Sequence, residues 1–250
     1  MISELATSMW DEAGRPDQAF GLYLFDGLDP RSEVARSLER EVFRETFGNS
    51  AQLMAEEYDT YESSSLLVCV MDHARRVPAG MVRIVFDADA GLKTVRDLDR
   101  VWGRPVDAVL ATAGIDRQRQ TVIDIATMAI GSEYRGAKAN GLISLALYRG
   151  QMLAMLESRT DVFIATLDLV VLDLLQQRCA DPFTRFDGCE PLRYLDSPSS
   201  LPVYCHMEPW GARLAAREPD MHGILWEGTG TEPFLWAPTL EHVATALPAA

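Results

Sequence analysis

The chain carries acidic side chains at two places where carboxylates could do chemistry. Glu57, Asp59 and Glu62 stand just before the apolar segment SLLVCVMD, and Asp124 lies inside the apolar segment TVIDIATMAI. A carboxylate can accept a proton from a nucleophile, or it can hold an ammonium group by charge-assisted hydrogen bonds. Burial in an apolar strand disfavours the charged form, so we expect a raised pKa at Asp124, which suits a base.

Each of these acidic groups also has a purely structural interpretation. Asp124 could bond the backbone or an arginine such as Arg83, which lies in an apolar segment itself and needs a carboxylate partner if it is buried. Glu57, Asp59 and Glu62 could form an ordinary solvated helix end, and Glu57 and Asp59 could also pair with that arginine. The residue types alone leave the catalytic and the structural roles open.

The composition describes a folded protein with an acidic surface. The chain has 250 residues, 48% of them hydrophobic, which suits one large domain with or without an extension. The formal net charge of −14 argues against DNA as a partner, because phosphate binding needs a basic surface. No apolar run reaches the roughly 18 residues of a membrane span, and the acidic start lacks a signal-peptide pattern. We therefore expect a cytoplasmic protein.

The four cysteines give no sign of a metal site or a disulfide framework. Cys69, Cys179, Cys189 and Cys205 form no CxxC pair, and no histidine cluster accompanies them. We expect reduced cysteines that act as small buried hydrophobes, and no metal.

Periodicity predicts the elements that position these residues. Alternating or continuous apolar patterns predict strands, and apolar residues every three or four positions predict helices. The predicted strands are 18–25, 65–72, 79–86, 121–130, 161–168, 191–194 and 202–207. The predicted helices are 32–47, 50–59, 142–158 and 169–178, with a short one near 106–113. This order of elements indicates a mixed α/β fold.

The segment TMAIGSEYRGAKANGLISLAL, residues 127–147, places a strand, a loop with an arginine and glycines, and a helix in succession. It resembles the phosphate-binding loop of the GNAT acyltransferase superfamily. The resemblance implies a central mixed, mostly antiparallel sheet flanked by helices, and we expect a C-terminal extension beyond the part of the chain that the resemblance covers. It also implies that an acyl thioester is bound as a co-substrate, with no permanently bound cofactor. The positions that would hold the thioester's phosphate are Ile130, Arg135, Gly136, Ala137, Lys138, Asn140 and Gly141.

The loop departs from the family at two positions, and the departure bears on the donor. The family usually has glycine or alanine where Lys138 and Asn140 stand, so that backbone amides can approach the pyrophosphate of coenzyme A. Longer side chains crowd such a cradle, although Gly141 restores part of it. A phosphopantetheine arm carries a single phosphate, so it needs less room in the loop than a pyrophosphate does. This favours the thioester of an acyl carrier protein over free acyl coenzyme A.

Residues 39–84 resemble the N-terminal half of acyl-homoserine-lactone synthases, and N-acyl amino acid synthases share a similar layout. In those enzymes an aromatic-ended helix precedes an acidic box, here Glu57, Asp59 and Glu62, and a hairpin that ends in an arginine, here Arg83. Other positions differ. The family's glutamate and arginine on the next strand fall on Asp124 and Thr127, and an arginine of its helix falls on Glu39, with Arg40 beside it. These changes argue against S-adenosylmethionine as the acceptor.

The resemblance and the chemistry of amide formation together suggest a role for each candidate residue. The proton-transfer candidates are Asp124, Glu57 and Asp59, with Tyr204 and His206 as alternative acids for the leaving thiolate. The backbone amide near Met128 is a candidate for the oxyanion. Substrate contacts are expected at Arg83, Glu62, Arg40, Thr127 and Thr166, the last of these for the acyl group.

The resulting hypothesis is an N-acyltransferase that acylates the amine of a small, amino-acid-like acceptor in signal or specialised-metabolite biosynthesis. We expect an acyltransferase domain over 1–207 and a tryptophan-rich extension over 208–250 packed on it, in a monomer or a homodimer. Two alternatives stay open. One keeps the fold but takes an aminoacyl group from tRNA, which the net charge disfavours, and the other is a binding module without catalysis.

Overall fold

The computed structural model describes residues 2–136 and 141–248, and these fall into two compact units. The first unit comprises Met1–Ile84, Thr127–Ser158 and Gly223–Ala250, and the second comprises Val85–Ala126 and Arg159–His222. Two strands, β3 (Val77–Phe86) and β4 (Val122–Ile130), pass from one unit into the other along the chain.

The first unit is built on a sheet whose strand order is β9-β1-β2-β3-β4. In addition to β3 and β4, this sheet contains β1 (Phe20–Asp26), β2 (Ser65–Asp72) and β9 (Leu235–Trp236). β1 and β2 are antiparallel along their whole length, from Phe20 opposite Asp72 to Asp26 opposite Leu66. β9 is parallel to β1 and pairs with only two of its residues, Phe20 and Gly21. This short pairing leaves the rest of β1 with one strand neighbour among the described residues.

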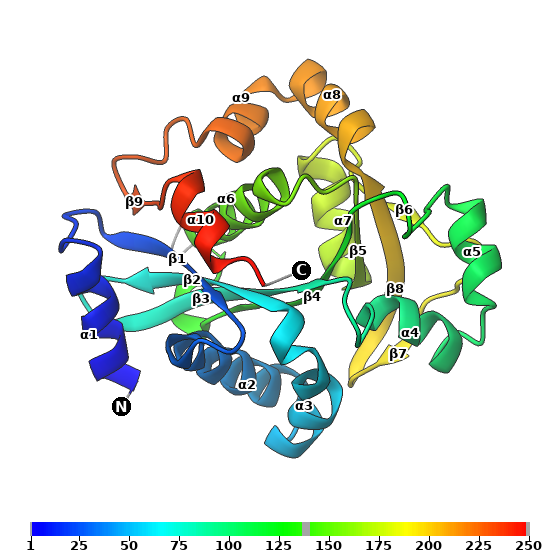
Figure 1. Ribbon diagram of the computed structural model, residues 1–250, viewed down its shortest axis with the longest axis horizontal. Coiled ribbons are helices and arrows are strands. Elements are labelled where there is room, and N and C mark those ends of the chain that lie inside the picture. Colours follow the sequence, from blue (N-terminus) through cyan, green and yellow to red (C-terminus); the bar gives the residue numbers. More distant parts are fainter. Residues whose placement is uncertain (1, 137–140, 249–250) are drawn as a thin grey trace. The chain divides into compact units, whose positions relative to one another are not determined.

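Helices cover both faces of this sheet (Figure 1). On one face, α1 (Ile2–Glu12) and α2 (Glu33–Phe47) bury Met9, Val34 and Leu38 against Tyr23 and Phe25. On the other face lies α6 (Leu142–Glu157). There, a Cβ added at Gly150 would clash with Val68, so only glycine lets this helix approach so closely. The remaining helical segments of the unit are η1 (Pro30–Ser32), α3 (Ala51–Tyr58), η2 (Asp59–Ser64), η3 (Ser132–Tyr134), η5 (Gly223–Glu227) and α10 (Leu240–Ala246).

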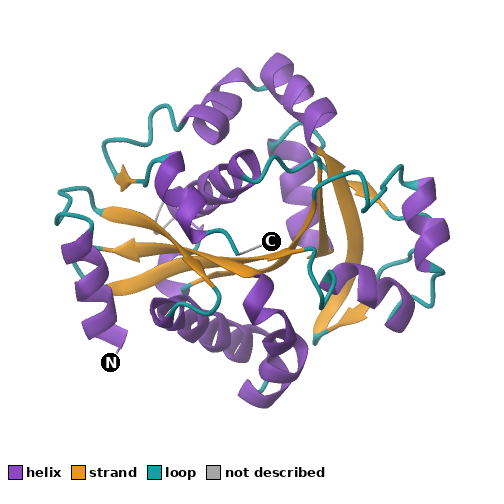
Figure 2. Ribbon diagram, in the orientation of Figure 1, coloured by secondary structure: helices purple, strands orange, loops and turns teal. Residues whose placement is uncertain are grey.

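The second unit combines the first half of β4 with four further strands (Figure 2). They are β5 (Val162–Asp168), β6 (Thr184–Arg185), β7 (Leu192–Tyr194) and β8 (Ser197–His206). β4 and β5 are parallel, and β8 is antiparallel to β5, β6 and β7. The helices are α4 (Lys93–Arg100), α5 (Val106–Thr112), α7 (Leu169–Arg178), α8 (Met207–Arg217) and α9 (Pro219–His222).

The fold class predicted from the sequence is confirmed: the chain is mixed α/β, with a mostly antiparallel sheet flanked by helices. Five of the described helices, α1, α4, α8, α9 and α10, were not predicted. Among them, α1 and α4 have sequences rich in polar residues, ISELATSMWDE and KTVRDLDR, so their apolar stripes are thin. Within the described residues, no helix is long and apolar enough to span a membrane.

The segment predicted as an extension, residues 208–250, contributes to both units. Most of α8 and the whole of α9 belong to the second unit, and η5, β9 and α10 belong to the first. Its tryptophans are anchored locally. Trp210 is buried against Phe163, with ring centroids 5.7 Å apart, and Trp236 packs against Tyr23 at 5.2 Å.

Candidate active site

A buried cluster of charges in the first unit surrounds Arg83. This residue lies on β3 and is only 2% exposed. Its guanidinium donates to Glu39 of α2 at 2.7 and 3.1 Å, and to Glu62 of η2 at 2.9 Å. Arg36 donates to the other oxygen of Glu62 at 2.7 Å, and the Thr127 hydroxyl donates to Glu39. We call these five residues the Arg83 cluster.

The charges of the Arg83 cluster compensate one another. Burial by itself would lower the pKa of Arg83, but the two facing carboxylates, Glu39 first and then Glu62, outweigh it and raise the pKa above its ordinary value. Arg83 is therefore a permanent cation. Breaking a buried pair of this kind leaves a charge without a partner in a low-dielectric environment, which is strongly destabilising.

The other two acidic-box candidates differ in their exposure to solvent. Glu57, at the end of α3, is buried at 8% exposure, and Asp59, two residues on, is exposed. Arg40 extends from α2 and donates to Glu33. Met128 follows Thr127 on β4 and is half-buried. Glu39, whose position departs from the family, turns out to be the main partner of Arg83.

A second buried cluster, in the second unit, surrounds Asp124 on β4. Asp124 is fully buried, and both of its oxygens accept from one residue: the Thr94 backbone N–H at 2.5 Å and the Thr94 hydroxyl at 2.9 Å. Since Thr94 is the second residue of α4, the carboxylate also caps the start of this helix. The Thr94 hydroxyl lies 3.4 Å from that of Thr166, which is partly exposed.

Burial raises the pKa of Asp124 to about 7, even though the two hydrogen bonds from Thr94 act in the opposite direction. A carboxyl group with this pKa exchanges its proton near neutral pH, which is the property that a general base needs. The chain of hydroxyls from Thr94 to Thr166 leads from the buried carboxyl toward a less buried position.

Three further residues complete the Asp124 cluster. Lys93, 2% exposed, donates to Asp97 at 2.7 Å, and the Tyr194 hydroxyl lies 2.5 Å from both of these side chains. The charge of Lys93 lowers the pKa of Asp124, and the charge of Asp97 raises it. This group was not predicted from the sequence. Its only local signal is the i,i+4 spacing of Lys93 and Asp97, which usually marks a solvated helix face.

The candidate acids on β8 share a sheet face with Asp124. Asp124 pairs with Ile164, which pairs with Tyr204, and directly paired residues project from the same face. Thr166 and His206 have the same parity on their strands, so they also lie on that face. His206 is bonded to the Ala113 carbonyl at 2.9 Å, and burial raises the pKa of Tyr204.

The predicted phosphate loop is described only in part. Arg135 donates to the Ile130 carbonyl at 2.7 Å, which folds the guanidinium back onto the end of β4. Gly136 and Gly141 both have left-handed backbone, with φ of 62° and 74°, which favours glycine. The remaining candidates of the loop, Ala137, Lys138 and Asn140, lie outside the described residues.

All four cysteines, Cys69, Cys179, Cys189 and Cys205, are buried free thiols. Burial raises the pKa of each, which makes them unreactive. Over residues 2–136 and 141–248, no three histidine, cysteine or acidic side chains are grouped as a metal site.

Comparisons with known proteins identify the fold. No family model matches the chain, and no curated protein matches it in sequence. Among solved structures, FeeM, an N-acyl amino acid synthase from uncultured soil microbes, matches with a TM-score of 0.60 at 15% identity, over 80% of this chain and 97% of FeeM. The acyl-homoserine-lactone synthase LasI matches with a TM-score of 0.51 at 12% identity, over 84% of this chain and 96% of LasI. The chain therefore has the GNAT acyltransferase fold, in the form found in N-acyl amino acid and acyl-homoserine-lactone synthases.

Proposed function

We propose that the protein is an N-acyltransferase that moves an acyl group from a carrier-bound thioester to the amine of a small, amino-acid-like acceptor. The observation that carries the proposal is Asp124, a fully buried carboxyl group with a pKa near 7. It shares a sheet face with a half-buried threonine, Thr166, and with two candidate acids, Tyr204 and His206. The fold shared with N-acyl amino acid synthases supports the same class of reaction.

In the proposed reaction the amine nitrogen attacks the thioester carbonyl, a C–N bond forms and the C–S bond breaks. The amine loses a proton to the Asp124 carboxylate through the hydroxyls of Thr166 and Thr94, because the carboxylate itself is fully buried. The departing thiolate takes a proton from Tyr204 or His206.

The donor is an acyl thioester of acyl carrier protein or coenzyme A. Coenzyme A serves in one protein of this fold, BjaI, a coenzyme A-dependent acyl-homoserine-lactone synthase that matches with a TM-score of 0.50 at 12% identity, over 92% of this chain and 98% of BjaI. In this chain the larger residues of the loop, Lys138 and Asn140, favour the single phosphate of a carrier protein's arm.

The acceptor is proposed to be an amino acid or a close relative, and not S-adenosylmethionine. Two positions that carry arginine in acyl-homoserine-lactone synthases are Glu39 and Thr127 here, and both are engaged within the Arg83 cluster. The loss of arginine at both places argues against S-adenosylmethionine as the acceptor. FeeM, by its description, makes N-acyl amino acids.

The test is a matrix of donors and acceptors. Acyl carrier protein and coenzyme A thioesters of several chain lengths are incubated with the common amino acids, and the free thiol released is measured. We expect turnover with at least one pair, and its loss in Asp124→Asn but not in Asp99→Asn, an exposed residue of the nearby helix α4. A wild-type protein that releases thiol with no pair would overturn the proposal.

A further inference from the structure

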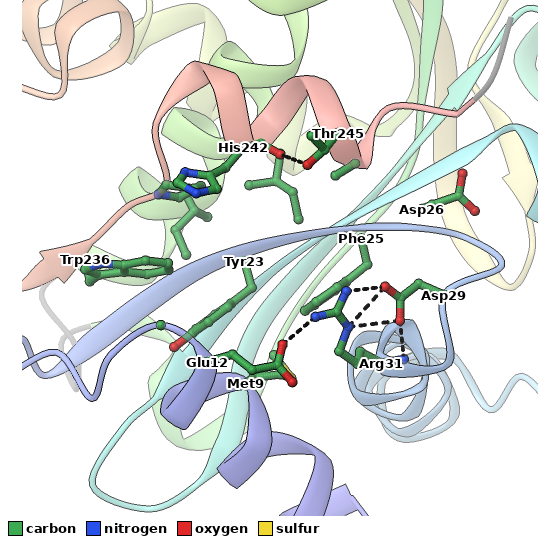
Figure 3. A pocket seen from close by; sticks show the side chains of 15 residues that line it. Met9, Glu12, Tyr23, Phe25, Asp26, Asp29, Arg31, Trp236, His242 and Thr245 are labelled. Atoms are coloured by element: carbon green, nitrogen blue, oxygen red, sulfur yellow. Dashed lines mark hydrogen bonds and ion pairs between the residues drawn. The ribbon is translucent and has the colours of Figure 1, made fainter.

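A pocket of about 400 Å³ opens along the outer edge of β1 in the first unit (Figure 3). Its walls come from α1, which contributes Met9 and Glu12, and from the C-terminal segment, which contributes Trp236 and His242. Its floor is the strand itself from Leu22 to Asp26. This volume is in the range of specific binding sites.

The floor of this pocket offers unpaired backbone groups. Gly27 N–H donates to Ser65 and Ala19 accepts from His73, so the odd-numbered residues of β1 bond to β2. Phe20 N–H instead donates to Phe234 on the other side, so the even-numbered residues face outward. β9 pairs with this outer edge of β1 only at Phe20 and Gly21. Pro238, two residues after β9, already lines the pocket.

Leu24 is the even-numbered residue in the middle of the uncovered edge. Its N–H and C=O therefore point into the pocket, where no strand of the described chain pairs with them. An edge of this kind is a template for an added strand, and β9 already uses the neighbouring positions in that way.

The two sides of the pocket suit the alternating side chains of an added strand. On the α1 side lie the largely buried rings of Tyr23 and Phe25, with the Arg31 guanidinium over Phe25, and at the rim the half-exposed carboxylate of Glu12. On the α10 side the strand contributes the partly exposed side chain of Leu24, next to the buried Leu22. A lysine stem can lie on aromatic rings while its ammonium reaches a carboxylate.

The charges around the pocket are mainly negative. The lining contains three carboxylates, Glu12, Asp26 and Asp29, against one guanidinium, Arg31, which is paired with Asp29 and Glu12. The protein as a whole carries a net charge of −14. A peptide with basic side chains therefore fits this negatively charged pocket better than an acidic peptide does.

We infer that the outer edge of β1 binds an extended peptide segment of a partner protein, in which apolar residues alternate with lysine or arginine. The segment adds to the sheet beside β1, bonds to the Leu24 backbone, and directs its basic side chains to the α1 side and its apolar side chains to the α10 side. This site is separate from the proposed acyl transfer and does not depend on it.

The first test uses a fluorescently labelled pentapeptide of alternating valine and lysine, matched to the five uncovered residues of β1, in anisotropy titrations. Two isomers carry backbone N-methyl groups on residues 3 and 5 or on residues 2 and 4, so that each has one methylated edge. We expect saturable binding of the parent and of one isomer, and affinity at least about 10-fold lower for the other. Equal binding of both isomers, or no binding of the parent, would overturn strand addition.

The second test uses protein variants. Leu24→Pro removes the outward N–H while keeping the β2 side of the strand, and proline is tolerated at such edge positions. Glu12→Lys reverses a charge at the rim, and Asp11→Lys makes the same change on the neighbouring exposed residue, which does not line the pocket. We expect Leu24→Pro and Glu12→Lys to weaken the valine–lysine peptide and Asp11→Lys to leave it unchanged. Equal effects of the two lysine variants would contradict the site.

Discussion

The Arg83 cluster and the Asp124 cluster are both buried, but they have opposite effects on the ionisation of their central residue. Arg83 is met by two carboxylates, and its pKa is raised well above any pH the protein meets. Asp124 is met by hydrogen bonds from a threonine, and its pKa is held near 7. The first arrangement fixes a charge permanently and is suited to holding structure. The second leaves a proton free to move, and is suited to chemistry.

The largest expected effect is on stability, at Arg83. Arg83→Met removes the cation and leaves Glu39 and Glu62 facing each other in a buried site, so the free energy of unfolding should fall by about 3–5 kcal/mol. Urea denaturation measures this. Arg44→Met, on an exposed position of α2, is the control and should change stability by less than about 0.5 kcal/mol. Similar stability of the two variants would contradict a structural role of the Arg83 cluster.

The next effect is on activity, at Asp124. Asp124→Asn keeps the shape of the side chain and removes its ability to take a proton, so turnover should fall by about 10²- to 10⁴-fold. The fold should survive, because an amide oxygen still accepts from Thr94. Circular dichroism checks the fold, and thiol release measures the rate. Retention of the wild-type rate in a folded variant would make Asp124 a helix cap only.

A smaller effect concerns the two charges beside Asp124. Lys93 lowers the pKa of Asp124 and Asp97 raises it. Lys93→Met should therefore move the acid limb of the pH–rate profile to higher pH, and Asp97→Asn should move it to lower pH. Each change breaks the same buried ion pair, so a loss of stability alone would affect both variants in the same direction. Shifts of opposite sign are what distinguish the electrostatic role.

The last effect is a pH dependence of folding. The pKa of Asp124 is raised in the folded protein from its ordinary value of 3.8 to about 7, so folding favours the protonated form. The contribution of this group to stability is complete below its unfolded pKa and is lost as the pH rises through the folded pKa. Between about pH 4 and 7 the slope due to Asp124 should be at most about 1.4 kcal/mol per pH unit. Denaturant titrations should show this decline in the wild type, and Asp124→Asn should lack it.

The burial of Arg83 and Asp124 could be predicted from the sequence, but most of the residues that surround them could not. Burial of Arg83 and Asp124 followed from their apolar neighbours, because a continuous apolar strand places every side chain in the interior. The partners did not follow. Glu39 is 44 positions from Arg83, and Thr94 is 30 positions from Asp124, and only the folded chain brings them together.

The missed features have a common physical origin. Lys93 and Asp97 look like an exposed helical ion pair in sequence, and the burial that changes their meaning is tertiary. The pocket at β1 depends on where β9 ends and on how α10 returns to the sheet. No local pattern in the segment PFLWAPTLEH predicts that the segment pairs with Phe20 and Gly21, more than 200 positions earlier.

The proposed function depends on Asp124 accepting a proton during acyl transfer. The most direct measurement is kcat/KM against pH for the wild-type protein, with the ¹³C NMR titration of the Asp124 carboxyl group recorded in parallel. We expect a rate that rises with a midpoint near pH 7, matching the titration of this carboxyl group. A rate that shows no such rise while the carboxyl group titrates near pH 7 would contradict it.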